Sequence, residues 1–202
     1  MIFESARDQR RSWPFRQRCL FIPNPILKRA PELEKNFDVA FVGRLNNLKH
    51  PEMIVRLGCD LSLRTVLVGD GPLLHELRQD AKLGQVELTG FLDDPWRKIG
   101  RDDLVVFPSD YEGDGRTVAE AIIRGNPVLL RDNPDLRRFN LAEDSYFSSY
   151  EILKRKTEDY RANGPEIYRP SSSVKKRLEE ERAPDSVGER WLQLLSQASS
   201  TL

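Results

Sequence analysis

Short apolar runs recur through the middle of the chain, and each is followed by a stretch with helical spacing. The runs are rich in Val, Leu and Phe, and they lie at 39–42, 65–68, 86–89, 104–107 and 128–130. The helical stretches between them begin with Pro or follow turn residues, and they lie at 51–57, 72–83, 95–99 and 117–124. Strands that alternate with helices in this way are typical of a parallel sheet covered on both faces. The pattern therefore predicts an α/β fold with a doubly wound, Rossmann-like sheet.

The character of the sequence changes after Tyr150. Charged segments with helical character lie at 151–160 and 175–182, and a Pro and Ser interruption at 170–173 separates them. Little of this stretch is expected to fill a hydrophobic core. The final segment, 187–195, has apolar residues at helical spacing and therefore one apolar face that needs a partner.

Composition favours one main domain and narrows the choice of partners. A chain of 202 residues with 39% hydrophobic content has room for one ordinary core. Lys and Arg together number 32, as do Asp and Glu, so no overall positive field favours nucleic acid as a partner. The two cysteines, Cys19 and Cys59, lie far apart and suit free thiols in a reducing compartment.

The first residues of the chain lack the features of an export signal. Residues 1–18 are polar and rich in Arg, and no apolar run reaches the roughly 20 residues that span a bilayer. We therefore expect a cytoplasmic protein. Trp13 and Phe15 lie within this basic segment, which leaves contact with the inner face of an anionic membrane open, although composition favours a solvated lead-in.

Polar and glycine-rich loops follow the expected strands. A doubly wound sheet binds ligands beyond the carboxyl ends of its strands, so a binding site is expected in these loops. The loops begin at Gly43, Gly69, Gly90, Ser109 and Arg131. Taken singly, a glycine after a strand is frequently only a turn former, and a lone charged residue is most often solvated. Their joint placement at one edge of one sheet favours a binding site instead.

The segment 110–120 carries the strongest chemical signal. Glu112 and Glu120 have seven residues between them, and Gly113 and Gly115 favour a loop that ends where a helix begins. The unpaired N–H groups and the positive dipole end of such a helix suit a diphosphate. Glu120 then lies about 6 Å along the helix, where it suits a ribose diol, while Glu112 faces the sugar hydroxyls of the same ligand.

Two cations follow the first expected strand. Arg44 offers a planar fork for phosphate oxygens and Lys49 a point charge, so together they suit a leaving nucleoside diphosphate. This pair removes the need for a metal, and no cofactor besides the donor substrate is expected. The sequence has no Asp-x-Asp pair, and its two histidines, His50 and His75, are expected to be isolated.

Four motifs in a fixed order give the chain a family resemblance. They are Phe41-Val-Gly-Arg-Leu45 with Lys49, Val68-Gly-Asp-Gly-Pro72, Gly90-Phe-Leu92, and the Glu112-x7-Glu120 pair that continues to Gly125-Asn-Pro-Val128. With these motifs, residues 22 to about 138 resemble the C-terminal, donor-binding domain of the retaining GT-B glycosyltransferases of group 1.

The resemblance implies a role for each candidate residue. Arg44, Lys49 and Glu112 are the expected catalytic residues, with the two cations on the diphosphate and Glu112 on the transferred sugar. The backbone at Phe91 and Leu92 is expected to meet the base. The other expected donor-binding residues are Gly43, Gly71, Gly113, Asp114 and Gly115, then Arg116, Thr117 and Val118 through their N–H groups to phosphate, and Glu120 to the ribose.

The resemblance also implies a division of the chain. Residues 1–26 are expected to be a remnant or linker from an acceptor-binding domain, 27–150 the nucleotide-sugar-binding domain, and 151–202 a C-terminal helical segment that crosses back to the acceptor-binding domain. The implied activity is transfer of a hexosyl group from a nucleoside-diphosphate sugar to a glycan, lipid or polysaccharide. The implied partner is an acceptor-binding domain or subunit, with peripheral membrane association through it, and the isolated chain is expected to be inactive.

One departure from the family pattern lies beside the expected ligand. The family usually has apolar residues at the positions of Asp114 and Arg116, whereas this chain places opposite charges there.

A non-catalytic nucleotide-sugar-binding or partner-binding module is the alternative function. A nicotinamide-dependent Rossmann enzyme is poorly supported, because no Gly-x-Gly-x-x-Gly follows any expected strand.

Overall fold

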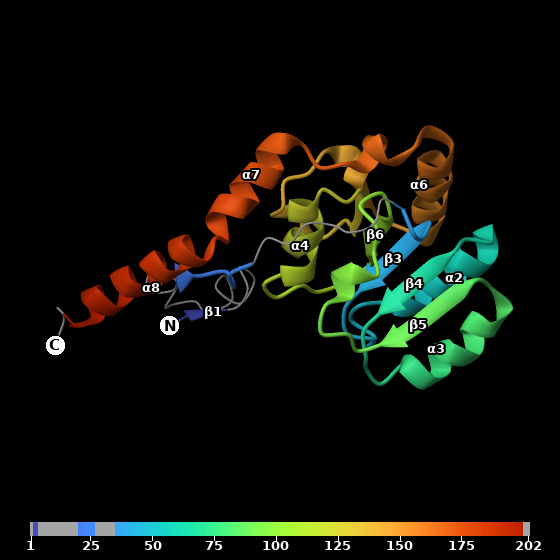
Figure 1. Cartoon of the computed structure of the whole chain (residues 1–202), viewed down its shortest axis with the longest axis horizontal. Helices are drawn as coiled ribbons and strands as arrows, with labels where there is room; N and C mark the ends of the chain where they lie inside the picture. The colour runs from blue at the N-terminus through green and yellow to red at the C-terminus, as the bar shows by residue number, and fades with distance from the viewer. Residues whose placement is uncertain (1, 4–19, 27–34, 200–202) are drawn as a thin grey trace.

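A six-stranded parallel sheet forms the centre of the molecule (Figure 1). The computed structural model describes residues 2–3, 20–26 and 35–199. The strands lie in the order β5, β4, β3, β6, β7, β8, and every neighbouring pair is parallel. In this doubly wound order the chain starts at the centre of the sheet, winds to one edge and then winds to the other. The predicted Rossmann-like α/β fold is confirmed.

The elements have the following bounds. The strands of the sheet are β3 (Val39–Val42), β4 (Thr65–Val68), β5 (Val86–Gly90), β6 (Leu104–Phe107), β7 (Val128–Arg131) and β8 (Tyr146–Phe147). The α-helices are α2 (Pro51–Leu61), α3 (Leu74–Asp80), α4 (Arg116–Arg124), α5 (Pro134–Arg137), α6 (Tyr150–Asn163), α7 (Ser172–Glu181) and α8 (Pro184–Ser199). Short 3-10 turns are η2 (Ala81–Leu83), η3 (Pro95–Arg97), η4 (Glu143–Ser145) and η5 (Pro165–Tyr168). Two short strands, β1 (Ile2–Phe3) and β2 (Leu20–Phe21), pair with each other apart from the main sheet.

Helices cover both faces of the sheet, because the side chains of its central strands are buried on both sides. Ala40 and Val42 of β3 join the core that α4 and α7 cover, whereas Val39 and Phe41 join the core that α2 and α6 cover. Every residue of β3, β4 and β6 is buried. Strands of this kind read as unbroken apolar runs, which is why the sequence located them correctly.

The observed structure adds several short elements to the expected ones and lacks one expected helix. The five expected strands are confirmed, but β1, β2, β8 and the short helix α5 were not expected, since two to four residues give no recognisable pattern. The helix expected at 95–99 is wrong, because only the 3-10 turn η3 forms. The two groups that an α-helix would pair are engaged elsewhere: the N–H of Gly100 donates to Asp103 at 2.8 Å, and the carbonyl of Trp96 accepts from Arg124 at 3.2 Å.

The expectation that little of the stretch beyond Tyr150 fills a core is wrong. Leu178 of α7 belongs to one core, and Leu153 and Tyr160 of α6 belong to the other. Their neighbours in sequence are charged and exposed, so the apolar faces are narrow and the composition of the segment conceals them.

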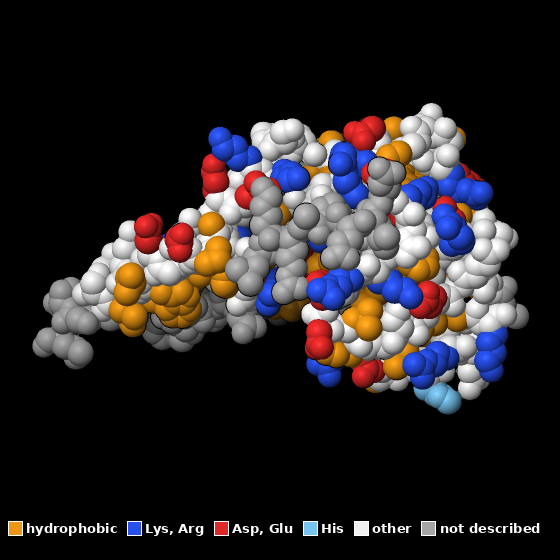
Figure 2. Space-filling view, in the orientation of Figure 1, with side chains coloured by type: hydrophobic (Ala, Val, Ile, Leu, Met, Phe, Trp, Pro, Cys, Tyr) orange, Lys and Arg blue, Asp and Glu red, His pale blue; other side chains and the backbone are white. Residues whose placement is uncertain are grey.

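Helix α8 extends away from the sheet, and three of its apolar residues are exposed, whereas Val187 near its start is buried (Figures 1 and 2). Leu192 is 69% exposed, Leu195 58% and Trp191 39%. At helical spacing these residues form an apolar stripe along the helix. Among the described residues, no helix has both the length and the apolar content that crossing a bilayer requires.

Candidate functional site

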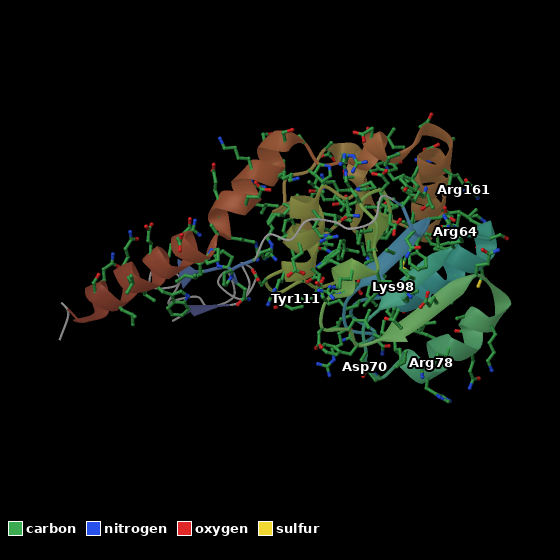
Figure 3. All side chains as sticks on the ribbon, in the orientation of Figure 1. Arg64, Asp70, Arg78, Lys98, Tyr111 and Arg161 are labelled. Atoms are coloured by element: carbon green, nitrogen blue, oxygen red, sulfur yellow. The ribbon has the colours of Figure 1, made fainter. Side chains whose placement is uncertain are left out.

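The loops that follow β3 and β6 meet where the strand order reverses. These two strands are neighbours at the centre of the sheet, and the N–H of Asp110 joins their loops by donating to the carbonyl of Leu48 at 2.9 Å. Figure 3 shows Asp70 and Tyr111 at this end of the sheet, and Arg64 and Arg161 at the opposite end. Because the crevice of a doubly wound sheet opens at such a reversal, this end is where a ligand site is expected.

A cavity of about 500 Å³ opens at this end of the sheet, and we call it the donor pocket after the ligand that the sequence predicts there. Its walls come from the loops after β3, β4 and β5 and from the first turns of α4. The lining residues are Val42, Gly43, Arg44, Val68, Gly69, Asp70, Phe91, Leu92, Asp93, Pro95, Arg116, Thr117 and Glu120. The pocket thus combines apolar walls with two guanidinium groups and three carboxylates.

Two glycines of the loop after β4 allow the loop after β3 to pass closely over them. Gly69 and Gly71 both have positive φ angles, of 148° and 159°. A side chain at Gly69 would overlap the carbonyl of Gly43, and one at Gly71 would overlap the backbone of Leu45. These glycines therefore shape the floor of the donor pocket by backbone packing, and only Gly69 of the two lines it.

Helix α4 begins at the donor pocket without a side-chain cap. Its N-cap is Gly115, in the left-handed conformation at φ 62° and ψ 39°. Because Gly115 has no side chain to accept from the first turn, the N–H groups of that turn lack a side-chain cap, and Arg116 and Thr117 present theirs at the pocket, whereas Val118 is buried.

The carboxylate of Glu120 is held in a fixed orientation at the pocket wall. Trp96, which is buried, donates its Nε1–H to Oε2 of Glu120 at 3.0 Å. Nε of Arg116 donates to Oε1 of the same carboxylate, also at 3.0 Å. The side chain of Glu120 is 16% exposed, so it is accessible from the pocket and largely immobilised by its two partners.

Lys49 and Glu112 pair with each other next to the donor pocket. Nζ of Lys49 lies 2.5 Å from Oε1 of Glu112 and also donates to the carbonyl of Tyr111 at 3.1 Å. The hydroxyl of Ser109 donates to the same Glu112 oxygen at 3.0 Å. The pair links the loop after β3 to the loop before α4, and it leaves Glu112 only 6% exposed.

Asp114 turns away from the pocket and bonds two distant segments. Its Oδ2 accepts from Nη1 of Arg182 at 2.9 Å and from the backbone and side-chain nitrogens of Asn24 at 3.3 and 3.0 Å. Arg182 follows α7 and is 3% exposed. The family usually has an apolar residue at this position. Here the charge of Asp114 forms a buried contact with the segment around Asn24 and with the end of α7.

His50 is not isolated, contrary to expectation. Its Nδ1 lies 2.7 Å from Glu52 and its Nε2 lies 2.6 Å from Asp110, so it joins the start of α2 to the loop after β6. Burial alone lowers the pKa of His50, but the hydrogen bonds to Asp110 and Glu52 and their charges outweigh it and raise the pKa. The hydrogen bond from His50 in turn lowers the pKa of Asp110. Sequence spacing gave no sign of this contact, because Asp110 lies 60 residues away.

The predicted site residues fall into two groups. The structure brings Gly43, Arg44, Phe91, Leu92, Arg116, Thr117 and Glu120 together in the donor pocket. Lys49, Gly71, Glu112, Gly113, Asp114, Gly115 and Val118 do not line it, and they form or support the loops behind its walls. Sequence reasoning did not name the other lining residues as site residues, although Gly69 and Asp70 follow a strand at its carboxyl end, where a site is expected; these residues are Val42, Val68, Gly69, Asp70, Asp93 and Pro95.

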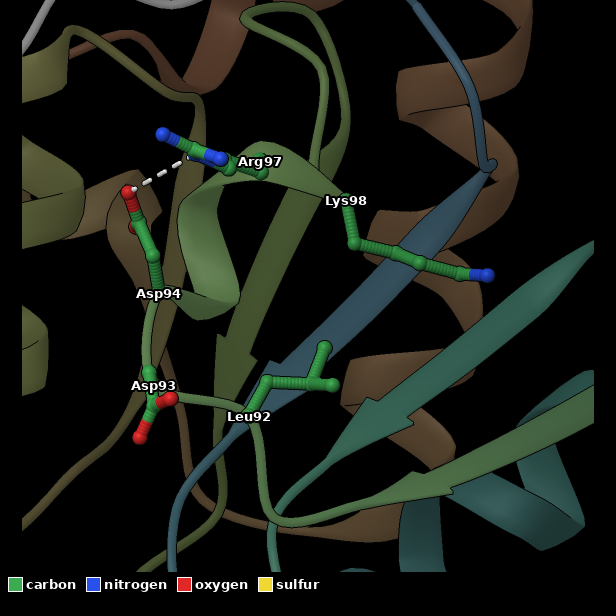
Figure 4. Close-up of a pocket in the computed structure, with 5 residues that line it drawn as sticks. All are labelled: Leu92, Asp93, Asp94, Arg97 and Lys98. Carbon is green, nitrogen blue, oxygen red and sulfur yellow. Dashed lines mark ion pairs between the residues drawn. The ribbon is translucent and has the colours of Figure 1, made fainter.

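A second pocket adjoins the donor pocket beyond β5 (Figure 4). It has a volume of about 520 Å³ and shares Leu92 and Asp93 with the donor pocket. Arg97 pairs with Asp94 at 3.5 Å, whereas Lys98 points away from that pair and bonds Glu87 at 2.6 Å. The two pockets therefore adjoin each other at these two shared residues.

Candidate metal ligands do not gather within the described ranges. No group of three or more His, Cys, Asp or Glu side chains lies close enough there to hold a metal ion. The expectation that the site works without a metal or cofactor stays a prediction.

The chain is similar in sequence to glycosyltransferases. Residues 24–145 match the family model of Glycosyl transferases group 1. The D-inositol 3-phosphate glycosyltransferase of Nocardia farcinica is 36% identical over 113 residues, which cover 46% of this chain and 25% of that protein. Its counterpart from Salinispora arenicola is 30% identical over 145 residues, which cover 62% of this chain and 30% of that protein. The chain thus matches less than a third of the length of these relatives.

Solved structures share the fold across nearly the whole chain. HepE from Anabaena, in complex with UDP, has a TM-score of 0.78 at 18% identity. The match covers 97% of this chain and 63% of the HepE chain. Sucrose-phosphate synthase from Thermosynechococcus elongatus has a TM-score of 0.73 at 18% identity. The match covers 100% of this chain and 58% of the synthase chain. At such identities the likeness establishes the fold alone.

Proposed function

The chain belongs to the group 1 glycosyl transferases, and we propose that it forms the donor-binding half of a two-domain, retaining member of that family. In this proposal the donor pocket holds a nucleoside-diphosphate sugar. The observation that carries the proposal is the convergence, at one reversal of strand order, of Arg44, the uncapped start of α4 and the fixed carboxylate of Glu120. These are the groups that a diphosphate and a ribose diol require.

We place the parts of the ligand along the two adjoining pockets as follows. The diphosphate lies against the N–H groups at the start of α4 and the guanidinium of Arg44, and the ribose lies against Glu120. The base then extends past Phe91 and Leu92 towards the second pocket, in keeping with the role predicted for that backbone. The transferred sugar lies on the side of Glu112 and the loop before α4.

The chemistry needs no nucleophile from the protein. The acceptor hydroxyl attacks the anomeric carbon from the face that the diphosphate leaves, so the bond from that carbon to phosphate oxygen breaks as the new glycosidic bond forms. A phosphate oxygen takes the hydroxyl proton, and the nucleoside diphosphate departs. Arg44 and the start of α4 stabilise the negative charge on the leaving group, which lowers the barrier without a metal, and Lys49 supports the site indirectly by holding Glu112 behind the pocket wall.

The acceptor is bound by a separate domain in this proposal. The chain matches only 25% and 30% of the two relatives, which leaves most of their length for other functions. The exposed stripe of Trp191, Leu192 and Leu195 on α8 supports docking of such a domain against this helix. We also propose that the complete enzyme transfers its sugar to glycans or polysaccharides, in the cytoplasm at the inner face of the membrane.

Direct binding measurements test the donor site. The chain should bind one of UDP, GDP, ADP and dTDP in calorimetry, with an affinity that EDTA leaves unchanged. Arg44→Ala should weaken that affinity roughly tenfold to hundredfold, since a hydrogen bond to a charged group contributes roughly 1.5–3 kcal/mol. Arg78→Ala, an exposed position on α3 outside the pocket, is the matched control. Unchanged affinity in Arg44→Ala would rule out the assignment.

Reconstitution separates the enzyme from a non-catalytic binding module. The chain is mixed with a separately expressed acceptor-binding domain of the same family and a radiolabelled nucleotide sugar. Transfer of label to an acceptor supports a catalytic half, and donor binding without transfer supports a binding module.

A further inference from the structure

Arg116 occupies an unusual place between two parts of the proposed donor. It is the first residue of α4, its side chain lines the donor pocket, and it is 60% exposed. Its Nε donates to Oε1 of Glu120, one helical turn further along. The guanidinium therefore contacts the carboxylate proposed for the ribose, and it belongs to the helical turn whose N–H groups are proposed for the phosphates.

The contact with Glu120 orients Arg116 before any ligand binds. Glu120 is itself fixed from behind by Trp96, so the guanidinium is anchored to a carboxylate that has little freedom to move. Within the described part of the chain, the hydrogen bond from Nε is the one recorded for the Arg116 side chain. The terminal nitrogens thus remain available in the geometry that suits phosphate oxygens.

The charge of the donor pocket makes this cation important. Arg44 and Arg116 are the cationic residues that line it, and they face Asp70, Asp93 and Glu120. A diphosphate that enters a pocket with three carboxylates requires compensation from both guanidinium groups. A bare nucleoside carries no charge and has no such requirement.

We propose that the Arg116 side chain is a donor-binding residue that grips the diphosphate while anchored to Glu120, and so selects nucleoside diphosphates over nucleosides. This inference rests on the proposed function. An ionised carboxylate accepts up to about four hydrogen bonds, so Glu120 can keep Arg116 and Trp96 and still accept from a ribose diol. The anchor then sets the spacing between the ribose and phosphate contacts.

The test measures two ligands against three variants. The ligands are the tightest of UDP, GDP, ADP and dTDP and its bare nucleoside, both titrated by calorimetry. The variants are Arg116→Ala, Arg116→Lys and the surface control Arg78→Ala, each checked for unchanged thermal unfolding. We expect Arg116→Ala to weaken the diphosphate roughly tenfold to hundredfold and the nucleoside less than about twofold. Arg116→Lys, which keeps the charge but loses the fork and its anchor, should fall between Arg116→Ala and the unchanged chain.

Each other outcome has a definite meaning. Equal weakening of both ligands would mean that Arg116 only orients Glu120, and this would overturn the inference. An unchanged diphosphate affinity in Arg116→Ala, alongside a loss in Arg44→Ala, would overturn the inference and leave the proposed function standing. If the unchanged chain binds none of the diphosphates, both the proposed function and the inference fall.

Discussion

Arg182 and Asp114 form a buried ion pair, with 2.9 Å between Nη2 and Oδ1, that ties the end of α7 to the loop before α4. The two side chains are 4% and 9% exposed. Arg182 also accepts at its carbonyl from the N–H of Ile26, and Asp114 accepts from Asn24, so the segment 22–26 joins the same contact. The segment 22–26, the loop before α4 and the end of α7 are therefore bonded to one another.

Removing Arg182 should destabilise the fold strongly. Arg182→Ala leaves the Asp114 carboxylate buried without its cation, a change that costs roughly 3–5 kcal/mol in the free energy of unfolding. Urea denaturation followed by circular dichroism measures this free energy.

The surface pair on the same helix provides the control for Arg182. Lys176 and Glu180 are 77% and 67% exposed at 3.8 Å, so Lys176→Ala should change the free energy of unfolding by less than about 0.5 kcal/mol. The double variant Asp114→Leu with Arg182→Leu should recover much of the loss, because neither charge is left unpaired. Similar losses in Arg182→Ala and Lys176→Ala would contradict this account.

Two glycines at the ends of α4 make a matched pair of substitutions. Gly115 and Gly125 both adopt the left-handed conformation, at φ 62° and 80°. A Cβ added at Gly115 would lie 2.8 Å from Phe139 and 2.9 Å from Arg138. A Cβ added at Gly125 would have one neighbour within 4 Å, Lys175 at 3.6 Å. Gly125→Ala should therefore cost about 1 kcal/mol for the backbone alone, and Gly115→Ala roughly 2–4 kcal/mol. Equal losses of unfolding free energy would show that the contact at Gly115 relaxes freely.

The contact of His50 should make stability depend on pH. Its pKa is raised in the folded chain, because the hydrogen bonds to Asp110 and Glu52 outweigh burial, so the protonated form is favoured by folding. This stabilisation is complete below the unfolded pKa of about 6.5 and is lost as the pH rises through the folded pKa. The difference in unfolding free energy between the unchanged chain and His50→Gln should be larger at about pH 5.5 than at about pH 9. A difference that stays constant or grows with pH would contradict this sign.

Lys49 should stabilise the fold through Glu112. Lys49→Met leaves the carboxylate of Glu112, 8% exposed, with Ser109 as its remaining side-chain partner and should cost roughly 1–3 kcal/mol. Glu112→Gln in the Lys49→Met background removes the buried charge and should restore part of the loss. Chemical denaturation of the single and double variants gives the coupling between the two residues, and additive effects would mean that the pair contributes nothing.

The sequence by itself determined the architecture of this protein. Strands β3, β4 and β6 are buried on both faces, so their apolar runs identified them without any tertiary information. The polar loops after the strands then predicted a candidate site, because parallel strands bring their carboxyl ends to one edge. Arg44 and Glu120 could be predicted on this basis and Arg116 from the family resemblance, and the structure places all three in one pocket.

Only the tertiary structure decided which side chains pair. Lys49 with Glu112, Trp96 with Glu120 and Arg182 with Asp114 are separated by 63, 24 and 68 residues. Local periodicity reports which face of an element is buried, but it contains no information about contacts between elements. The partners of a charged side chain depend on loop paths and on desolvation at the site, and both exist only once the sheet and its helices have packed.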